Sequence, residues 1–329
     1  MTLRDIPGTD LRVSPLCLGT ALYGADAAAS HQLIDTPTAY SLLDAFVARG
    51  GNFIDTARSY NDWIPGERGR SEGLIGRWFA DRRNRNHLML ATKGGHASDD
   101  GAPRLNARDL GADIDASLRR LRIEAIDLYY LHRDDPTAAV APIIDALNAH
   151  VRAGKIRYLG CSNWSAARIR EANDYAAASG QAGFVANQPL WNAGVIEAAT
   201  QSDRTLTTMN DEMRRMHSET GLACVPYSAQ AGGLFTKLQS PWYALRFRLG
   251  KGPTGYPSAP NRRRHAALLS VASARQLTIT QVVLGYLLSQ PFVTVPVVGC
   301  RTVDQLVSTM TASDIRLDAA DLATIDAAR

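Results

Sequence analysis

Four residues that can carry or exchange a proton follow short apolar runs in this chain of 329 residues. Asp55 closes the run GNFID with Tyr60 a short loop beyond it, Lys93 follows HLMLAT, and His132 closes IDLYYLH. An ammonium beside a phenol stabilises the phenolate, so Lys93 is expected to lower the pKa of Tyr60 from about 10, while the carboxylate keeps the amine charged. With an imidazole donating to a substrate oxygen, this set predicts general acid catalysis by Tyr60.

Each of these residues also has a purely structural interpretation. Asp55 and Lys93 could form a buried ion pair, Tyr60 could pack in a loop, and His132 could cap a strand, because polar residues are common at strand ends. The presence of all four at the ends of neighbouring apolar runs favours chemistry over these separate structural roles.

The segments around these residues alternate between strand-like and helix-like patterns. Eight short apolar runs are spaced along the chain: PLCLG, GNFID, HLMLAT, IDLYYLH, IRYLGCS, FVANQ, LACVPYS and TVPVVG. Stretches between them, such as LGADIDASLRRL, repeat apolar residues three and four positions apart, which is typical of helices. Strands that are apolar throughout indicate a parallel sheet buried on both faces, and eight such units close an α/β (β/α)8 TIM barrel. An open, doubly wound sheet is the alternative.

Two segments stand outside this repeat. LRDIPGTDLRV, before the first barrel strand, predicts an N-terminal β-hairpin with a Pro-Gly turn that could plug the bottom of the barrel. Residues 236–264 contain GKGPTGYPSAP and predict a long loop, a kind of segment that is usually functional. Extra C-terminal helices are expected near 265–275 and 318–328. No linker marks a boundary, so residues 1–329 are expected to form one domain.

Composition indicates a compact protein, with 45% hydrophobic and 21% charged residues. The net charge of +4 comes from dispersed arginines. Their densest runs, 82–85 and 262–264, lack interleaved aromatic residues, which favours a solvated face over a nucleic-acid site. Four widely separated cysteines without a histidine at ligand spacing argue against zinc and disulfides. No signal peptide or membrane-spanning run is evident, so a cytoplasmic protein is expected.

The segments GGNFIDTARSY, LATKGG and IDLYYLHRDDP resemble three signature segments of the aldo-keto reductases, and the resemblance covers nearly the whole chain. It implies a (β/α)8 barrel, a small-molecule carbonyl substrate, and NADPH as the usual reductant, with NADH possible. It also implies a catalytic tetrad at Asp55, Tyr60, Lys93 and His132. The expected activity is reduction of an aldehyde or ketone to the alcohol by hydride transfer.

Further segments are similar to the family's cofactor-binding segments. The resemblance implies that GCSNW and ANQPLW contact the nicotinamide carboxamide and that Tyr227 stacks on the nicotinamide ring. VPVVGCRTVDQL would surround the adenosine phosphate, where the guanidinium of Arg301 suits a 2′-phosphate. The cofactor residues implied in this way are Ser162, Asn163, Gln188, Tyr227, Ser228, Gln230, Gly233, Leu234, Lys237, Gly299, Arg301, Thr302 and Gln305.

The sequence departs from the family pattern in two places. Ser308 and Thr309 stand where the family often has a Glu and an Asn that contact adenine, so adenine is expected to be held differently. The segment YNDWIPGERGRSE places extra residues between Tyr60 and the next helix, and we expect it to shape the substrate pocket. Aromatic residues near strand ends are the predicted pocket walls: Tyr23, Trp63, Trp164 and Trp191.

The resemblance also allows other functions. Potassium-channel β-subunits are similar to this family and bind a nicotinamide cofactor with little turnover, so a regulatory subunit is the alternative, and fold alone does not decide between them. A phosphate-binding barrel enzyme without nicotinamide is a third possibility. The complete tetrad favours an enzyme, and no pattern indicates an oligomeric state.

Overall fold

The computed structural model describes residues 1–25, 33–62, 64, 68–98, 101–201 and 203–328. Its main sheet has eight strands in the order β11-β10-β9-β8-β7-β6-β3-β12, and every neighbouring pair is parallel. These strands are β3 (Cys17–Gly19), β6 (Phe53–Asp55), β7 (Met89–Gly94), β8 (Ile126–Leu131), β9 (Ile156–Ser162), β10 (Phe184–Gln188), β11 (Ala223–Cys224) and β12 (Val297–Val298).

The two end strands of this sheet meet and close a barrel. Cys224 in β11 forms a parallel bridge with Thr294, shortly before β12. The backbone N–H of Val297 donates to the carbonyl of Pro226 at 2.9 Å, which extends the contact. Each of the eight predicted apolar runs overlaps one of these strands. The predicted (β/α)8 barrel is therefore confirmed, and the open, doubly wound alternative is wrong.

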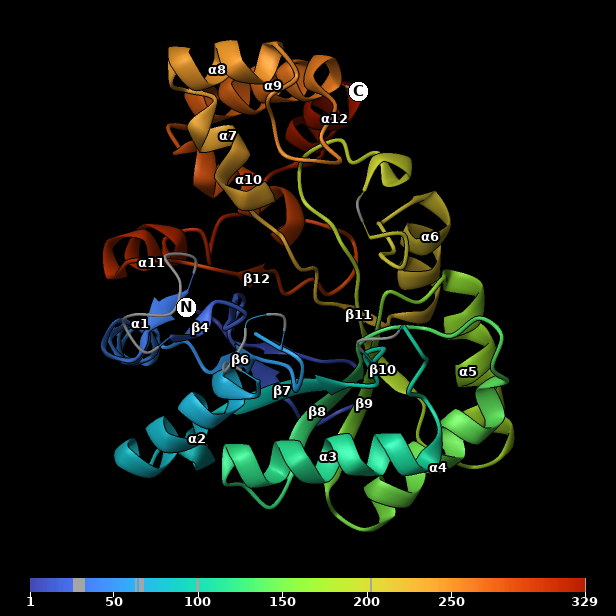
Figure 1. The fold of residues 1–329 in the computed structure, drawn as a ribbon. Coiled ribbons are helices and arrows are strands. Elements are labelled where there is room, and N and C mark those ends of the chain that lie inside the picture. Colours follow the sequence, from blue (N-terminus) through green and yellow to red (C-terminus); the bar gives the residue numbers. More distant parts are fainter. Residues whose placement is uncertain (26–32, 63, 65–67, 99–100, 202, 329) are drawn as a thin grey trace.

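Helices follow the barrel strands and cover the outside of the sheet (Figure 1). Ser165 starts one of them, because its side chain accepts from the backbone N–H of Arg168 and so satisfies a free donor of the first turn. Gly50 and Gly154 follow two of the helix ends with positive φ, as a helix-terminating glycine requires. These helices are α1 (Thr36–Ala48), α2 (Arg70–Arg82), α3 (Ala107–Leu121), α4 (Val140–Arg152), α5 (Ala166–Ala178), α6 (Asp211–Thr220), α10 (Ile279–Leu288) and α11 (Val303–Met310).

The N-terminal hairpin closes the bottom of the barrel, as predicted. Strands β1 (Arg4–Asp5) and β2 (Arg12–Val13) pair antiparallel. Ile6 and Leu11 are almost completely buried and belong to the same apolar cluster as the inward-facing Phe53. Burial of such side chains contributes about 1.5–3 kcal/mol each, so the hairpin is part of the barrel core.

The segment predicted as a long loop, 236–264, is largely helical, and that prediction is wrong. It contains α8 (Pro241–Arg248) and the start of α9 (Ser258–Arg275), after the short helix α7 (Leu234–Lys237). Pro241 occupies the first turn of α8, where its missing N–H costs nothing. The Gly/Pro-rich residues 250–257 do form a loop, but a short one between α8 and α9. The expected C-terminal helix is present as α12 (Ala319–Ala327). Helices α8, α9 and α12 form a layer at one end of the molecule (Figure 1).

No single helix in the described part of the chain is long and apolar enough to cross a membrane. Helices α9 and α10 together are long and apolar enough to do so, but they are bent by 97° at the break between them. The apolar character of α10 reflects burial instead, because nearly all its side chains lie inside the protein.

Candidate active site

Lys93 lies at the centre of a buried polar cluster where β6 and β7 end. Its Nζ donates to Oδ2 of Asp55 at 2.6 Å and to Oη of Tyr60 at 2.9 Å. A third bond, of 2.8 Å, goes to the carbonyl oxygen of Thr56. Asp55 and Lys93 are each 1% exposed, so water does not screen their attraction. The ammonium therefore has three fixed acceptors, one of which is the phenolic oxygen.

Burial controls the acidity of this cluster. It raises the pKa of Tyr60 to about 12, although the Lys93 ammonium lowers it. The expected fall below the ordinary value is therefore wrong, because burial and the Asp55 charge outweigh the ammonium. Burial also opposes the charge of Lys93, yet Asp55 and Tyr60 raise the pKa of Lys93 on balance. At neutral pH the phenol keeps its proton and the amine keeps its charge.

His132 lies beside the phenol at the end of β8. The ring centroids of Tyr60 and His132 are 5.9 Å apart in an edge-on arrangement, and Nδ1 of His132 is 3.2 Å from Oγ of Ser59. Burial holds the pKa of His132 well below its usual range, and the nearby cations Arg133 and Lys93 act in the same direction. The imidazole is therefore neutral at physiological pH. The structure brings all four predicted catalytic residues together.

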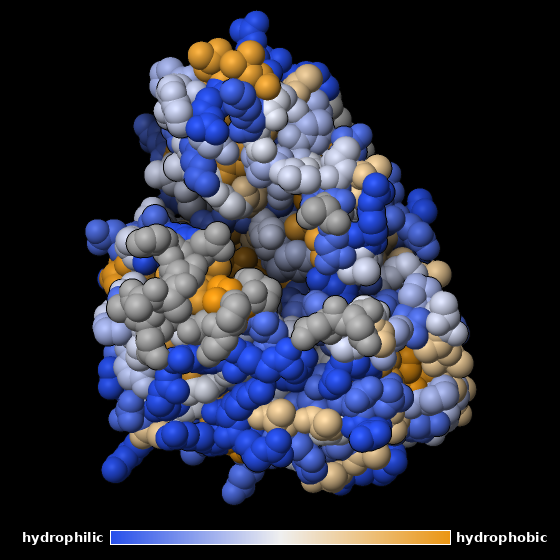
Figure 2. Space-filling view, viewed as in Figure 1, coloured by the Kyte–Doolittle hydropathy of each residue, from blue (hydrophilic) through white to orange (hydrophobic). Residues whose placement is uncertain are grey.

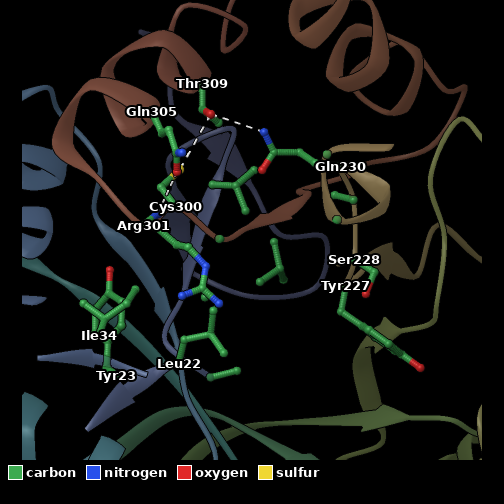
Figure 3. A pocket seen from close by; sticks show the side chains of 18 of the residues that line it. Leu22, Tyr23, Ile34, Tyr227, Ser228, Gln230, Cys300, Arg301, Gln305 and Thr309 are labelled. Carbon is green, nitrogen blue, oxygen red and sulfur yellow. Dashed lines mark hydrogen bonds between the residues drawn. The ribbon is translucent and has the colours of Figure 1, made fainter. Parts of the chain in front are cut away.

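A cavity of about 1100 Å³ opens over this cluster. Tyr60 and His132 line it, as do Arg301 and Gln305 at the start of α11. Figure 3 shows Tyr227 and Ser228 on one side of the cavity and Arg301 and Gln305 on another. The surface is hollowed between the layer of extra helices and the barrel (Figure 2). The cavity is large enough for a dinucleotide.

Most of the predicted cofactor residues line this cavity. Asn163 accepts from the Tyr227 hydroxyl at 2.9 Å, which joins the ends of β9 and β11 at the cavity wall. Gly232 and Gly233 have positive φ angles of 60° and 77° and form the turn before α7. Because glycine has no side chain, the cavity wall at this turn consists of backbone atoms. The predicted residues that line the cavity are Ser162, Asn163, Gln188, Tyr227, Ser228, Gln230, Gly233, Lys237, Gly299, Arg301 and Gln305.

Leu234 and Thr302 have structural roles instead. Leu234 is 1% exposed and belongs to the apolar cluster under the extra helices. The Thr302 hydroxyl accepts from the backbone N–H of Gln305 at 3.2 Å and so caps α11. Neither side chain lines the cavity, so the structure does not support their predicted cofactor contacts.

The predicted aromatic walls divide in a similar way. Tyr23 lines the cavity. Trp164 does not, because it is fully buried, packs edge-on against Phe184 and donates from Nε1 to a backbone carbonyl. Trp191 is 3% exposed and packs against Phe292 inside the core. The prediction of Trp164 and Trp191 as pocket walls is therefore wrong, and Trp63 lies outside the described residues.

Two functional candidates next to predicted residues were missed. His96 packs edge-on against His132, with ring centroids 5.0 Å apart. Arg133 lines the cavity and bonds Asp203 through Nη2 at 3.0 Å. Both follow a predicted residue closely in the sequence, His96 after Lys93 and Arg133 after His132. Their position just beyond a strand end was the signal that could have found them.

The two residues that depart from the family pattern lie at the end of the cavity formed by α11. Ser308 and Thr309 both line the cavity. Nε2 of Gln230 donates to the Thr309 hydroxyl at 3.2 Å, and the Cys300 thiol lies 3.7 Å from the same oxygen (Figure 3). The loop after β11 is thus tied to α11 by a direct side-chain contact.

A closed (β/α)8 barrel thus carries a buried cluster of Asp55, Lys93 and Tyr60, with a neutral His132 beside it, at the edge of a cavity. The sequence model of the Aldo/keto reductase family matches residues 15–329, and the chain belongs to that family.

Several named relatives align with nearly all of this chain. Norsolorinic acid reductase B of Aspergillus parasiticus is 31% identical over 320 residues, which span 94% of this chain and 79% of that protein. Norsolorinic acid reductase stcV of Emericella nidulans is 32% identical over 319 residues, with 94% and 77% covered. An aryl-alcohol dehydrogenase (NADP(+)) of Phanerodontia chrysosporium is 31% identical over 335 residues, with 94% and 81% covered.

Proposed function

We propose that this chain is an NADPH-dependent reductase that converts an aldehyde or ketone to the alcohol, with Tyr60 as the general acid. The observation that carries the proposal is the 2.9 Å contact between Lys93 Nζ and Tyr60 Oη at the edge of the cavity. Family membership supports carbonyl reduction, and the NADP(+) in the name of one relative supports NADPH.

Each residue of the cluster has a distinct role in this proposal. A nicotinamide bound in the cavity would supply the hydride. Tyr60, which keeps its proton at neutral pH, gives that proton to the carbonyl oxygen as charge develops there. Lys93 then stabilises the tyrosinate that remains, and Asp55 holds Lys93 charged and oriented. His132 positions the oxygen by donating a hydrogen bond.

The cavity residues fit a dinucleotide along its length. The polar side chains of Ser162, Asn163 and Gln188 lie near the catalytic cluster and would hold the carboxamide. The Tyr227 ring would stack on the nicotinamide, and the glycine turn before α7 would let the pyrophosphate approach the backbone. Arg301, which projects into the cavity in Figure 3, would pair with the 2′-phosphate.

Consumption of NADPH with a panel of carbonyl compounds tests the proposal. Norsolorinic acid and aryl aldehydes are the first probes, because the names of the relatives print norsolorinic acid and aryl alcohols, followed by open-chain sugars. Tyr60→Phe should lower kcat by about 10²–10⁴-fold and leave the NADPH dissociation constant, measured by fluorescence quenching, within about twofold. Tyr40→Phe is the matched control, because Tyr40 also contacts a carboxylate, Asp81, but on the exposed surface.

Two outcomes would contradict the proposal. Equal turnover by the Tyr60→Phe variant would remove Tyr60 as the acid. Tight NADPH binding without consumption across the panel would instead favour the regulatory-subunit alternative.

A further inference from the structure

The backbone of His132 is fixed by hydrogen bonds on two sides. Its N–H donates to the carbonyl of Gly94 at 2.8 Å. Its carbonyl oxygen accepts from Asn163 at 3.1 Å and from Arg133 at 2.9 Å. The imidazole ring has a hydrogen-bond partner, Ser59 on the loop after β6, whose Oγ lies 3.2 Å from Nδ1 of His132. Tyr60 and His96 also pack edge-on against this ring, but the Ser59 contact is its one hydrogen bond within the described residues.

Hydrogen-bond accounting assigns the donor in this contact. Ser59 is 7% exposed, and within the described residues its hydroxyl has no side-chain or backbone partner other than His132. If Nδ1 carried the proton, Ser59 would accept it and its own hydroxyl proton would stay unbonded in a buried site, which folded proteins avoid. If the hydroxyl donates, both atoms are satisfied. Nδ1 is then the acceptor.

The choice of donor matters because His132 is neutral. A neutral imidazole has a single N–H, and the partner of one nitrogen decides whether the other nitrogen can donate. An imidazolium would donate from both nitrogens, and Ser59 would then have little influence. The neighbours Arg133 and His96 both lower the pKa of His132, after the larger effect of burial, so the neutral form is the relevant one.

We propose that Ser59 is a positioning residue that holds His132 in the Nε2–H tautomer by donating its hydroxyl hydrogen to Nδ1. The consequence is an N–H available to a carbonyl oxygen in the cavity that His132 lines. The catalytic consequence rests on the proposed function, whereas the tautomer itself does not.

Nitrogen NMR of the whole protein labelled with ¹⁵N-histidine tests the tautomer directly. The His132 signals are assigned from their loss in His132→Gln. In the unsubstituted protein we expect Nδ1 to show the shift of an unprotonated, pyridine-type nitrogen and Nε2 that of a protonated one. In Ser59→Ala we expect averaged shifts from a mixture of tautomers. A protonated Nδ1 in the unsubstituted protein would overturn the proposal whatever the activity.

Kinetics test the catalytic consequence. Loss of one hydrogen bond to the imidazole should reduce kcat for carbonyl reduction by roughly three- to tenfold in Ser59→Ala, with the KM for NADPH within about twofold. Ser59→Thr retains a hydroxyl and should recover most of the loss. Ser313→Ala is the matched control, because Ser313 is also buried and donates to a carbonyl at 2.8 Å, but outside the cavity lining.

These readouts separate the two proposals. If Tyr60→Phe remains active, the proposed function fails, while the NMR result still decides the tautomer. If Ser59→Ala shows mixed tautomers but unchanged kcat, the positioning role of Ser59 is overturned and the role of Tyr60 stands.

Discussion

Gln188 donates from Nε2 to Oδ1 of Asp55 at 2.9 Å, across 133 positions of sequence. The other oxygen of Asp55 accepts from Lys93. Both oxygens of this buried carboxylate are therefore bonded, one by the ammonium and one by an amide from β10. The same Gln188 lines the cavity, so a residue that the family resemblance assigns to the nicotinamide also supports the catalytic carboxylate.

Replacing Gln188 should therefore affect stability as well as cofactor binding. In Gln188→Leu the Oδ1 atom of Asp55 loses its partner, and we expect the free energy of unfolding to fall by about 1–3 kcal/mol. Urea unfolding monitored by circular dichroism measures this change. The matched control is Gln181→Leu, because Gln181 makes a similar 2.8 Å bond to Asp145 on the exposed surface and its loss should change stability by less than about 0.5 kcal/mol. Equal changes in the two variants would contradict the supporting role.

Removing the ammonium should destabilise the fold more strongly. Lys93→Met leaves the Asp55 carboxylate, which is 1% exposed, without a cation, and breaking a buried pair in this way costs about 3–5 kcal/mol. Asp55→Asn combined with Lys93→Met removes the uncompensated charge and should recover part of the loss, although both variants lack turnover. Urea midpoints of the single and double variants measure this difference. A double variant less stable than the single one would argue against the pair as the source of the effect.

Acid should weaken the fold through buried histidines. Burial lowers the pKa of His217 from 6.5 to about 4, so between these values the unfolded chain binds more protons than the folded one. The free energy of unfolding therefore rises with pH in this window and is lost on acidification from pH 6.5 towards pH 4, by up to roughly 3 kcal/mol. The lowered pKa of His132 acts in the same direction.

The variant His217→Gln isolates this contribution. The glutamine side chain has no group that binds a proton in this pH range. The free energy of unfolding of this variant should therefore fall less steeply as the pH is lowered, even if its value at pH 7 is smaller. The control is His87→Gln, which replaces an exposed histidine. Its free energy of unfolding should depend on pH as steeply as that of the unsubstituted protein. Parallel slopes in all three proteins would show that His217 is not a source of acid sensitivity.

The barrel could be predicted from the sequence because its strands are buried on both faces and read as continuous apolar runs. The lengths of the strands could not be predicted in the same way. LACVPYS and TVPVVG contain strands of only two residues, β11 and β12. Pro226 and Pro296 lack the N–H that ladder pairing needs, and this shortens the strands while leaving the barrel order intact.

The residues of the catalytic cluster could be predicted from the sequence, but their pKa values could not. Strand ends place Asp55, Lys93 and His132 at one edge of the barrel whatever their packing. The pKa of Tyr60 depends on how much water reaches the phenol, which is a property of the folded site. Likewise, an apolar pattern does not distinguish a tryptophan in a pocket wall from one in the core, and Trp191 lies in the core.

Arg301 should determine the preference between the two nicotinamide cofactors. Its guanidinium makes no hydrogen bond or ion pair within the described residues and projects into the cavity (Figure 3). Hydrogen bonds to a charged group contribute about 1.5–3 kcal/mol, so Arg301→Ala should weaken NADPH binding by about 10–100-fold. NADH lacks the 2′-phosphate, and its dissociation constant should change by less than about threefold. Fluorescence titration with both cofactors measures the ratio, with Arg152→Ala on the exposed end of α4 as the control. An equal loss for both cofactors would place Arg301 on a part of the dinucleotide that they share, such as the pyrophosphate.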